Sequence, residues 1–280
     1  GDDKIYGIEN PGYPKIAKIY DSMHVSYSAI DLDEHGVCID SLEDHQIDIM
    51  HLSPSHHFPT GIITPISRRY ELLGWASKDE NRYIIEDDYD SELRLGGKPI
   101  PTLQSIDVSD KVIYMNTFTK TLSSTVRISY MVLPASLTEL FYKKLSFYSC
   151  TVSNFEQYTL ARFMESGSFE KHINRLRNYY QNKRDAILEI FKTAPLDQYI
   201  TIKEEDSGVH FMMKLKTDRT EMDMISDAKS KGIKLAPLSK YFVSQTSNMN
   251  FQNVYVMNYS SIDLEQLSLI FDALCHILIK

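Results

Sequence analysis

The sequence predicts an α/β protein with a mainly parallel sheet, followed by a smaller α+β unit. Short apolar runs that end in polar or turn residues mark the first half, and the three clearest span 82–85, 111–115 and 127–133. Such runs are typical of strands buried on both faces of a parallel sheet, although periodicity alone does not separate them from buried helix. We therefore expect a large domain over 1–168 and a smaller domain over 169–280.

Composition and charge narrow the class of protein. The chain has 280 residues, 42% hydrophobic and 24% charged, with a formal net charge of −8. Negative charge argues against a nucleic-acid surface on this chain, because phosphate binding requires a basic patch. No apolar run approaches the roughly 18 residues of a membrane helix. The three cysteines, Cys38, Cys150 and Cys275, are widely spaced, which indicates reduced thiols in a cytoplasmic protein.

The amino-terminal part supplies further strands and crossover helices. Thr64-Pro65 precedes apolar residues at Ile66, Tyr70 and Leu73, a spacing that fits a helix between two parallel strands. The expected elements are a strand over 5–8, a helix over 15–22, apolar stretches at 24–30 and 36–39, a strand over 47–52 and a helix over 66–76.

Beyond Pro134 the pattern changes to helices and then mixes strands with helices. The third of these helices is long enough to join the two domains, and the mixed order after it predicts an α+β sandwich. The expected helices span 135–148, 154–166, 169–192, 220–231 and 263–279, and the expected strands span 199–203, 208–215, 233–236 and 254–259.

Polar side chains follow two of the strands and suit one cofactor. Ligands of open α/β sheets bind beyond the carboxyl ends of the strands, so we expect Asp87, Tyr89 and Lys120 in one crevice. A lysine amine can form an imine with the aldehyde of pyridoxal phosphate. A carboxylate can keep the pyridine nitrogen protonated, and a tyrosine two residues later can hydrogen-bond the phenolic oxygen.

A phosphate group would also find partners here. Thr117 and Thr119 precede Lys120, and Arg127 follows it by seven residues. Hydroxyl and guanidinium groups are good hydrogen-bond donors to phosphate. Each of these residues is a weak signal alone, since a lysine after a strand is usually solvated; the ordered set is more specific.

Metal sites are the alternatives. The carboxylates between Asp87 and Glu92 could hold magnesium in a phosphotransferase, but that leaves Thr117, Thr119 and Arg127 without a role. A calcium loop of the EF-hand type would need glycine where Leu93 stands. Six of the nine histidines lie between His24 and His57, without the spacing of a known metal motif.

Three segments resemble a known family. HLSPSHHFPTGIITPISRR (51–69), YIIEDDYDSELR (83–94) and VIYMNTFTKTLSSTVRISYMVLP (112–134) closely resemble the aminotransferase-like domain of MocR/GabR-type regulators of the GntR family. Such proteins join a winged-helix DNA-binding domain to a domain with the architecture of fold type I pyridoxal-phosphate-dependent aminotransferases. The resemblance implies a homodimer that binds DNA only through an upstream domain, with this chain covering a partial large domain and the smaller one.

The resemblance also implies a role for each site residue. Lys120 would form the Schiff base (the internal aldimine), Asp87 would face the pyridine nitrogen, and Tyr89 would face the phenolic oxygen. Phosphate contacts would come from Thr117, Thr119 and Arg127. Metal ligands are not implied.

The sequence departs from the aminotransferase pattern in three places. His56 and His57 lie on the loop that faces the cofactor, but Phe58 replaces an asparagine there, as in MocR-type regulators, so Tyr89 would bind the phenolic oxygen alone. The stretch 253–261 lacks the arginine that usually binds a substrate carboxylate; either Lys234 or Lys240 substitutes as a point charge, or the ligand is not a carboxylate. The segment 9–14 lies well inside the large domain of the family, so we expect an amino-terminally truncated chain without the phosphate-binding turn.

Two functions remain. The first is an effector-sensing domain that holds pyridoxal phosphate on Lys120 and responds to an amine or amino-acid ligand. The alternative is a working aminotransferase, for which the missing arginine is unfavourable because a charge-assisted pair contributes about 1.5 to 3 kcal/mol. A scaffold that dimerises without the cofactor is a third possibility.

Overall fold

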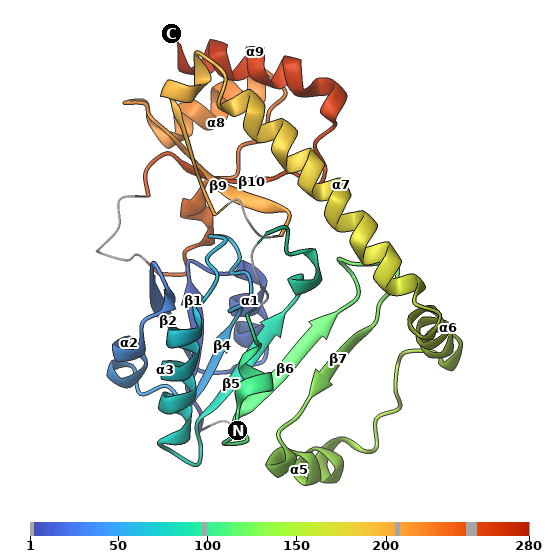
Figure 1. Ribbon diagram of the computed structural model, residues 1–280. Helices are drawn as coiled ribbons and strands as arrows, with labels where there is room; N and C mark the ends of the chain where they lie inside the picture. The colour runs from blue at the N-terminus through green and yellow to red at the C-terminus, as the bar shows by residue number, and fades with distance from the viewer. Residues whose placement is uncertain (1–2, 97–99, 205–207, 245–250, 280) are drawn as a thin grey trace.

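The computed structural model describes residues 3–96, 100–204, 208–244 and 251–279. A seven-stranded sheet and a three-stranded sheet form two units, which a long helix, α7 (Ser168–Phe191), connects (Figure 1). The order before α7 is β1 (Tyr6–Asn10), α1 (Pro14–Ser22), β2 (Tyr27–Asp33), β3 (Gly36–Val37), α2 (Ile39–Asp44), β4 (Ile49–Leu52), α3 (Ile66–Ser77), β5 (Tyr83–Asp88), η1 (Ser91–Leu93), α4 (Leu103–Ile106), β6 (Val112–Thr117), β7 (Ser129–Val132), α5 (Ala135–Leu145) and α6 (Asn154–Glu165).

The large sheet is mainly parallel, which confirms the predicted fold class. Its strand order is β3-β2-β1-β4-β5-β6-β7, with parallel pairing from β2 through β6. Only the two edge pairs are antiparallel, namely β2 with β3 and β6 with β7. The carboxyl ends of the parallel strands point toward the second unit (Figure 1).

One face of the sheet, which we name the closed face, carries the core of the large unit. Helices α2 and α3 cover it, and Trp75 and Leu72 of α3 are buried there. The strands contribute alternate residues, since successive side chains point to opposite faces. The closed-face strand residues of this core are Ile30, Leu32, Met50, Leu52, Ile84 and Val112.

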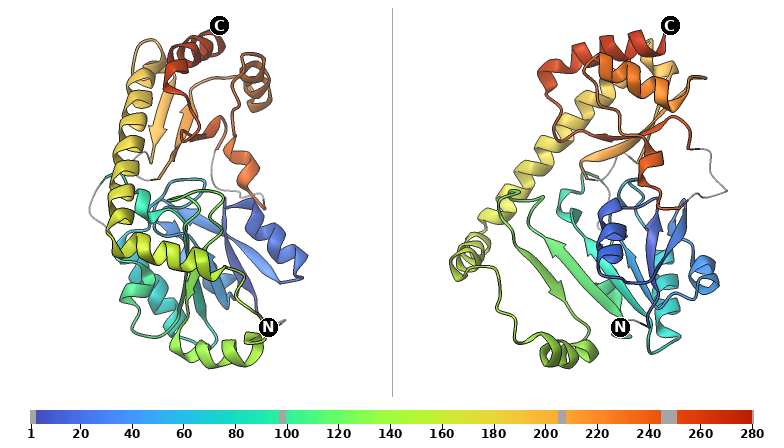
Figure 2. Two further views of the ribbon diagram at one scale, coloured as in Figure 1. Left: turned by 90° about the vertical axis from the view of Figure 1, so that its right-hand side faces the viewer. Right: turned by 180° about the vertical axis from the view of Figure 1, so that it is seen from behind.

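The opposite face, which we name the open face, has less cover. It carries Tyr6, Tyr27, His51, Ile85, Asp87, Ile113 and Met115, and each of these is only partly buried. Helix α1 packs on it through Tyr20 and is seen in front when the molecule is turned by 180° (Figure 2). The expectation that these strands are buried on both faces is therefore wrong, because helices cover the two faces unequally.

The last strand departs further from the prediction. The run 127–133 is predicted as a third buried strand, yet β7 runs antiparallel to β6 and all four of its residues are exposed. Tyr130, Met131 and Val132 are apolar, so composition alone indicated burial. Helices α5 and α6, which follow, have no buried residues. The segment from β7 to α6 thus exposes a concentration of large apolar side chains.

The second unit has its own core. Its elements are η2 (Leu196–Gln198), β8 (Ile200–Lys203), β9 (His210–Leu215), α8 (Glu221–Ser230), η3 (Leu238–Tyr241), β10 (Val254–Asn258), η4 (Leu264–Gln266) and α9 (Leu267–Leu278). The antiparallel order β10-β9-β8 supports a core that includes Phe211, Met213 and Leu274. Leu93 and Leu95, which follow β5, enter the same core, so the large unit is anchored in the small one.

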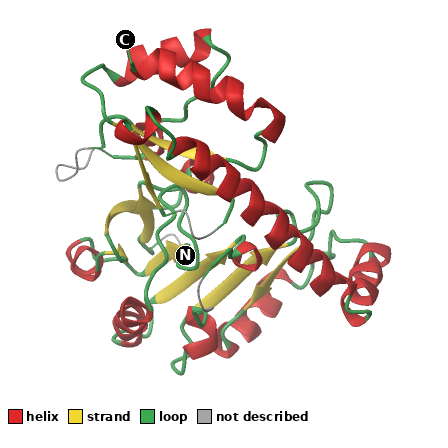
Figure 3. Cartoon of the chain, turned by 45° about the horizontal axis from the view of Figure 1, so that its top comes forward, coloured by secondary structure: helices red, strands yellow, loops and turns green. Residues whose placement is uncertain are grey.

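Helix α7 contacts both units. His172, near its beginning, hydrogen-bonds the carbonyl of Thr121 through Nε2 at 2.8 Å. Lys183 donates to the carbonyl of Ser260 at 2.9 Å, and Ile187 and Phe191 are buried in the core of the second unit. Figure 3 shows α7 crossing from one sheet to the other. The division at residue 168 stays a prediction, since α7 belongs to both units.

One expected strand is not formed, and two short helices were not expected. The stretch 36–39 becomes the two-residue strand β3 and then α2, a helix that the sequence did not indicate. The expected strand over 233–236 forms none, and only an isolated bridge between Pro237 and Tyr255 is found near it. The short helix α4 was also missed, although Thr102 caps it by accepting from the amide of Ser105. Among the described residues, no helix is long and apolar enough to cross a membrane.

Candidate cofactor and ligand site

The six predicted site residues lie at one edge of the large sheet. Asp87, near the end of β5, pairs with Met115 of the parallel strand β6. Thr117 ends β6, where it is paired with Ser129 of β7. Tyr89 follows β5, Thr119 and Lys120 follow β6, and Arg127 precedes β7, so the topology brings all six to the edge that faces the second unit.

Strand alternation separates three consecutive acidic residues. Glu86 points to the closed face, where it accepts hydrogen bonds from two backbone amides of α4 at 2.9 Å and lies 3.6 Å from the guanidinium of Arg69. Asp88 accepts from the hydroxyl of Tyr114 at 2.8 Å on the same face. Asp87 alone points to the open face, with 27% of its side chain exposed. Of the three, Asp87 is the carboxylate that a ligand can reach.

Two aromatic residues lie behind Asp87. His51 of β4 places Nε2 3.7 Å from a carboxylate oxygen of Asp87. The other ring nitrogen, Nδ1, hydrogen-bonds the hydroxyl of Tyr20 on α1 at 2.9 Å. The sequence analysis missed both residues. Because the strands that contain residues 51 and 87 are expected to be parallel neighbours, His51 could have been placed near Asp87.

Tyr89 faces a histidine. Its hydroxyl lies 3.3 Å from Nδ1 of His56, whose ring stacks on that of Tyr89 with centroids 6.1 Å apart. The same Nδ1 lies 2.9 Å from the carboxylate of Asp90, and both partners are buried. Burial, followed by the charges of Asp90 and Asp87, raises the pKa of Tyr89 well above its usual value. The hydroxyl therefore stays protonated and can donate a hydrogen bond.

His56 also connects the site to the second unit. Its ring lies 4.3 Å from that of His210, the first residue of β9. Gly208 packs so closely on His56 that a Cβ atom there would collide with the ring. Burial, with the neighbouring charges of His56, His57 and finally Lys120, lowers the pKa of His210 well below its usual value. His210 is thus a neutral contact between the units, which no sequence pattern indicated.

The residues predicted to hold a phosphate are partly or fully accessible. The hydroxyls of Thr117 and Thr119 lie 2.9 Å apart, and the hydroxyl of Thr117 donates to the carbonyl of Ile128 at 3.3 Å, which leaves the hydroxyl of Thr119 as the donor for a ligand. Lys120 and Arg127 are exposed, so an amine and a guanidinium are available beside these hydroxyls. Together with the accessible carboxylate of Asp87, this donor set fits pyridoxal phosphate, which needs an amine, a carboxylate and phosphate donors.

The place of the missing arginine is apolar. On β10, Val254 and Val256 form a cluster with Leu238, against which Phe58 packs. Phe58 therefore shares an apolar surface with β10. Lys234 and Lys240, the two possible substitutes, are both exposed. Their role stays a prediction.

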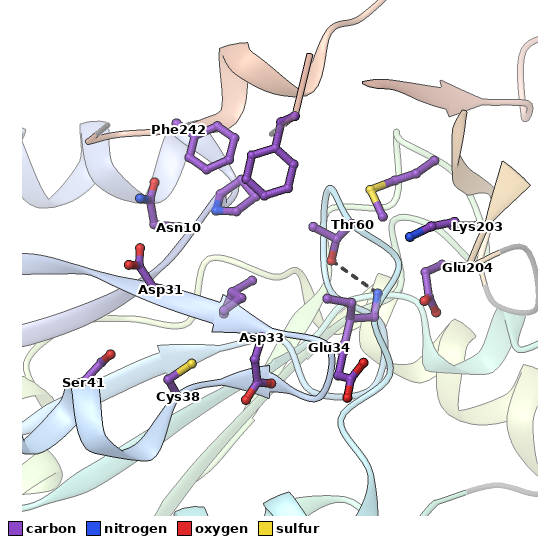
Figure 4. A pocket seen from close by; sticks show the side chains of 15 residues that line it. Asn10, Asp31, Asp33, Glu34, Cys38, Ser41, Thr60, Lys203, Glu204 and Phe242 are labelled. Atoms are coloured by element: carbon purple, nitrogen blue, oxygen red, sulfur yellow. Dashed lines mark hydrogen bonds between the residues drawn. The ribbon is translucent and has the colours of Figure 1, made fainter. Parts of the chain in front are cut away.

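A separate cavity lies beside the ends of β1 and β2, away from β5 and β6. Its volume is about 520 Å³, and its walls combine the carboxylates of Asp31, Asp33 and Glu34 with the rings of Phe242 and Phe251 (Figure 4). None of the six predicted site residues lines it. Clustered carboxylates repel a phosphate, so this cavity and the predicted phosphate site are different places.

Comparison with solved structures defines the class of the fold. The chain superimposes on kynurenine aminotransferase from Pyrococcus horikoshii with a TM-score of 0.82 at 24% identity, covering 99% of this chain and 69% of that one. The α-aminoadipate aminotransferase LysN from Thermus thermophilus gives a TM-score of 0.79 at 22% identity, covering 99% and 72%. The architecture is that of the fold type I pyridoxal-phosphate-dependent aminotransferases.

Sequence comparison narrows the class to one family. The uncharacterized HTH-type transcriptional regulator YdeL of Bacillus subtilis is 40% identical over 233 residues, which are 83% of this chain and 50% of that protein. The probable rhizopine catabolism regulatory protein MocR of Rhizobium meliloti is 28% identical over 256 residues, or 91% and 51%. No family model matches the chain. The chain belongs to the family of MocR-type regulators of the GntR class and spans about half the length of these relatives.

Proposed function

We propose that this chain is the effector-sensing domain of a bacterial transcriptional regulator, and that it binds pyridoxal phosphate and responds to an amine ligand. One observation carries the proposal. Lys120, Asp87, Thr117 and Arg127 lie at one edge of a sheet whose fold is that of pyridoxal-phosphate-dependent aminotransferases. Two of the relatives, at 40% and 28% identity, are described as a transcriptional regulator and a regulatory protein.

Each side chain has a defined task in this proposal. Pyridoxal phosphate, when bound, supplies an aldehyde that condenses with amines and a ring that withdraws electrons. The exposed amine of Lys120 would hold the group covalently. The carboxylate of Asp87 would keep a proton at the pyridine nitrogen, and the protonated hydroxyl of Tyr89 would donate to the phenolic oxygen. Thr117, Thr119 and Arg127 would bind the phosphate.

Contacts between the units give a route for sensing. Tyr89 touches His56, and His56 packs on Gly208 and His210 of the second unit. A ligand that binds one arrangement of the two units more tightly than another shifts the population toward it. We propose that the amine ligand acts in this way, since the site and the contact between the units share Tyr89 and His56.

The proposal extends to the partners. MocR-type relatives are HTH-type regulators, so DNA binding would reside in a winged-helix domain outside this chain, in the cytoplasm. A homodimer of this domain is proposed from the same relationship. The exposed apolar segment from β7 to α6 is consistent with a surface that a second chain covers.

An active aminotransferase is the second candidate. Aromatic-amino-acid aminotransferase 1 of Thermococcus litoralis is 28% identical over 261 residues, which are 88% of this chain and 62% of that enzyme. The apolar cluster at Val254 and Val256, without a guanidinium among its described residues, is unfavourable for an α-carboxylate. Conversion of an amino acid and a 2-oxo acid by the purified protein would favour this candidate.

The deciding experiment is reduction of the bound cofactor. The protein is mixed with pyridoxal phosphate, reduced with borohydride, digested and examined by mass spectrometry, both for this chain and for any longer form of the protein. We expect a pyridoxyl group on Lys120, because the lysine is exposed beside the phosphate donors. Absorbance recorded before reduction, with a panel of amines, then reports which ligand changes the spectrum.

The matched control is Lys144→Ala, which removes an exposed lysine of α5 far along the chain from the site. Lys120→Ala should abolish the specific label, and Lys144→Ala should retain it. A label distributed over several lysines, or one that persists in Lys120→Ala, would contradict the proposal.

A further inference from the structure

A buried ring nitrogen on the open face lacks a hydrogen-bond partner among the described residues. It is Nε2 of His51, and it has almost no contact with solvent. The carboxylate of Asp87, 3.7 Å away, is the charged group that it faces. That separation exceeds a hydrogen bond but lies within the reach of an ion pair, and small adjustments of either side chain would close it. A buried polar atom without a partner is costly, so its orientation requires an explanation.

The other ring nitrogen of His51 is hydrogen-bonded to Tyr20, which can set the tautomer of the imidazole. The hydroxyl of Tyr20 lies 2.9 Å from Nδ1 of His51, and the ring of Tyr20 packs beside those of Tyr6 and Tyr27. Burial, followed by the charges of Tyr6 and Asp87, raises the pKa of Tyr20, so this hydroxyl remains a donor. When it donates to Nδ1, the proton of neutral His51 resides on Nε2 and points at Asp87.

We propose that His51, held by Tyr20, is a positioning residue that orients the carboxylate of Asp87 toward the cofactor. The inference rests on the proposed function, because it assigns Asp87 to the pyridine nitrogen. An N–H donor behind one carboxylate oxygen restricts rotation of the carboxylate and leaves the other oxygen directed outward. In metal sites, removal of a partner one step removed from the bound ion changes affinity by about 10-fold to 100-fold, and we expect an effect of similar size here.

The surroundings of Asp87 explain why such a partner is needed. Glu9 is also buried near Asp87, and burial, opposed by a hydrogen bond from the amide of Ser53 and reinforced by the charge of Asp87, raises the pKa of Glu9 well above its usual value. The neighbour of Asp87 on this side is thus an acid whose raised pKa favours its protonated form. An N–H of His51 directed at Asp87 would hold the carboxylate in place as a hydrogen-bond donor.

The test compares three variants in the form of the protein that binds pyridoxal phosphate. His51→Leu removes both ring nitrogens, His51→Gln keeps an N–H donor, and Tyr20→Phe removes the hydroxyl that sets the tautomer. Two quantities are measured: the dissociation constant for pyridoxal phosphate, and the ¹⁵N chemical shift of the pyridine nitrogen of the labelled cofactor as a function of pH.

We expect His51→Leu to weaken binding by about 10-fold and to lower the pH at which the pyridine nitrogen loses its proton. His51→Gln should stay within about 3-fold of the wild type, and Tyr20→Phe should fall between them, since neutral His51 would then populate both tautomers. His35→Leu, at an exposed histidine after β2, is the control and should change neither quantity.

The outcomes separate this inference from the proposed function. If the wild type binds the cofactor on Lys120 but His51→Leu leaves the ¹⁵N titration unchanged, the inference is overturned and the proposed function stands. A lower affinity for pyridoxal phosphate without a change in the titration would show that His51 acts only through its packing. If the wild type binds no pyridoxal phosphate in either length, both are overturned. Circular dichroism identifies a variant that fails to fold, and Tyr20→Phe, which removes one oxygen atom, then decides.

Discussion

The closed and open faces of the large sheet are made from alternate residues of the same strands, yet they differ in burial and in the cover that helices provide. On the closed face, Ile30, Met50 and Ile84 are fully buried under α2 and α3. On the open face, Tyr6, Ile85 and Ile113 remain partly exposed beside the single helix α1. The closed face therefore supplies stability, and the open face leaves side chains available for binding.

The acidic residues after β5 make the same point within one segment. Glu86 and Asp88 are fixed by the amides of α4, by Arg69 and by Tyr114, so they are structural. Asp87, between them, is accessible to a ligand. Charge and sequence position do not distinguish the three, but the side of the sheet does.

The largest expected difference is in core stability. Ile84→Ala removes a fully buried side chain of the closed face and should lower the free energy of unfolding by about 2 to 5 kcal/mol. Ile85→Ala removes the same atoms from the partly exposed position next to it and should cost about 1 kcal/mol. Urea unfolding followed by circular dichroism measures both.

Equal losses for the two variants would break the comparison, since they would mean that the open face is as well packed in solution as the closed one. A larger loss of unfolding free energy for Ile84→Ala than for Ile85→Ala would support the difference between the two faces, because the two substitutions are chemically identical and adjacent.

The second prediction concerns Glu86 and pH. Burial, opposed by the two amides of α4 and by Arg69, raises the pKa of Glu86 from 4.5 to about 7. Between these values the folded state keeps a proton that the unfolded state has lost, so the contribution of Glu86 to stability is present below about pH 4.5 and falls as pH rises toward 7. Relative to Glu86→Gln, the wild type should lose about 1 to 3 kcal/mol between about pH 5 and 7.5. Urea unfolding at several pH values tests this.

Asp87→Asn is the matched control for Glu86→Gln. It removes the next carboxylate, on the open face, and should change the free energy of unfolding by less than about 0.5 kcal/mol while weakening cofactor binding. A parallel pH dependence of wild type and Glu86→Gln would show that Glu86 does not titrate in this range.

The smallest expected effect lies at the sheet edge. Met131 of β7 is 44% exposed, so Met131→Thr, which keeps a residue suited to strands, should change the free energy of unfolding by less than about 0.5 kcal/mol. Thermal unfolding at low protein concentration is the measurement. A loss above about 1 kcal/mol that grows with protein concentration would show that a second chain covers β7.

Much of the fold was predictable because the closed face follows simple rules. The apolar runs at 82–85 and 111–115 predicted β5 and β6. The stripe at Ile66, Tyr70 and Leu73 predicted the helix α3 but not its buried face, because Leu72, Trp75 and Ala76 are buried while Ile66 and Tyr70 are exposed. The run at 127–133 correctly predicted the strand β7, but β7 is exposed rather than buried and runs antiparallel to β6. Burial depends on what packs against a strand, and that information is not local to Tyr130 or Met131.

The residues of the candidate site could be proposed one by one from the sequence, but their contacts could not. Lys120, Asp87 and Tyr89 could be chosen from their order along the chain and from their chemistry. His210 lies 123 positions beyond Asp87 and approaches the site only because β9 packs against the loop that carries His56. Contacts of this kind depend on how the two units pack, which no local spacing encodes.

The length of α7 has a mechanical consequence. Its 24 residues give a rigid rod of about 36 Å, bonded to Thr121 beside Lys120 near one end and embedded in the second unit at the other. A tilt of about 5° at the Lys120 end would displace the far end by about 3 Å, as a lever arm does. A sub-ångström rearrangement around one lysine can therefore become a displacement of about 3 Å at the end of α7 that lies in the second unit.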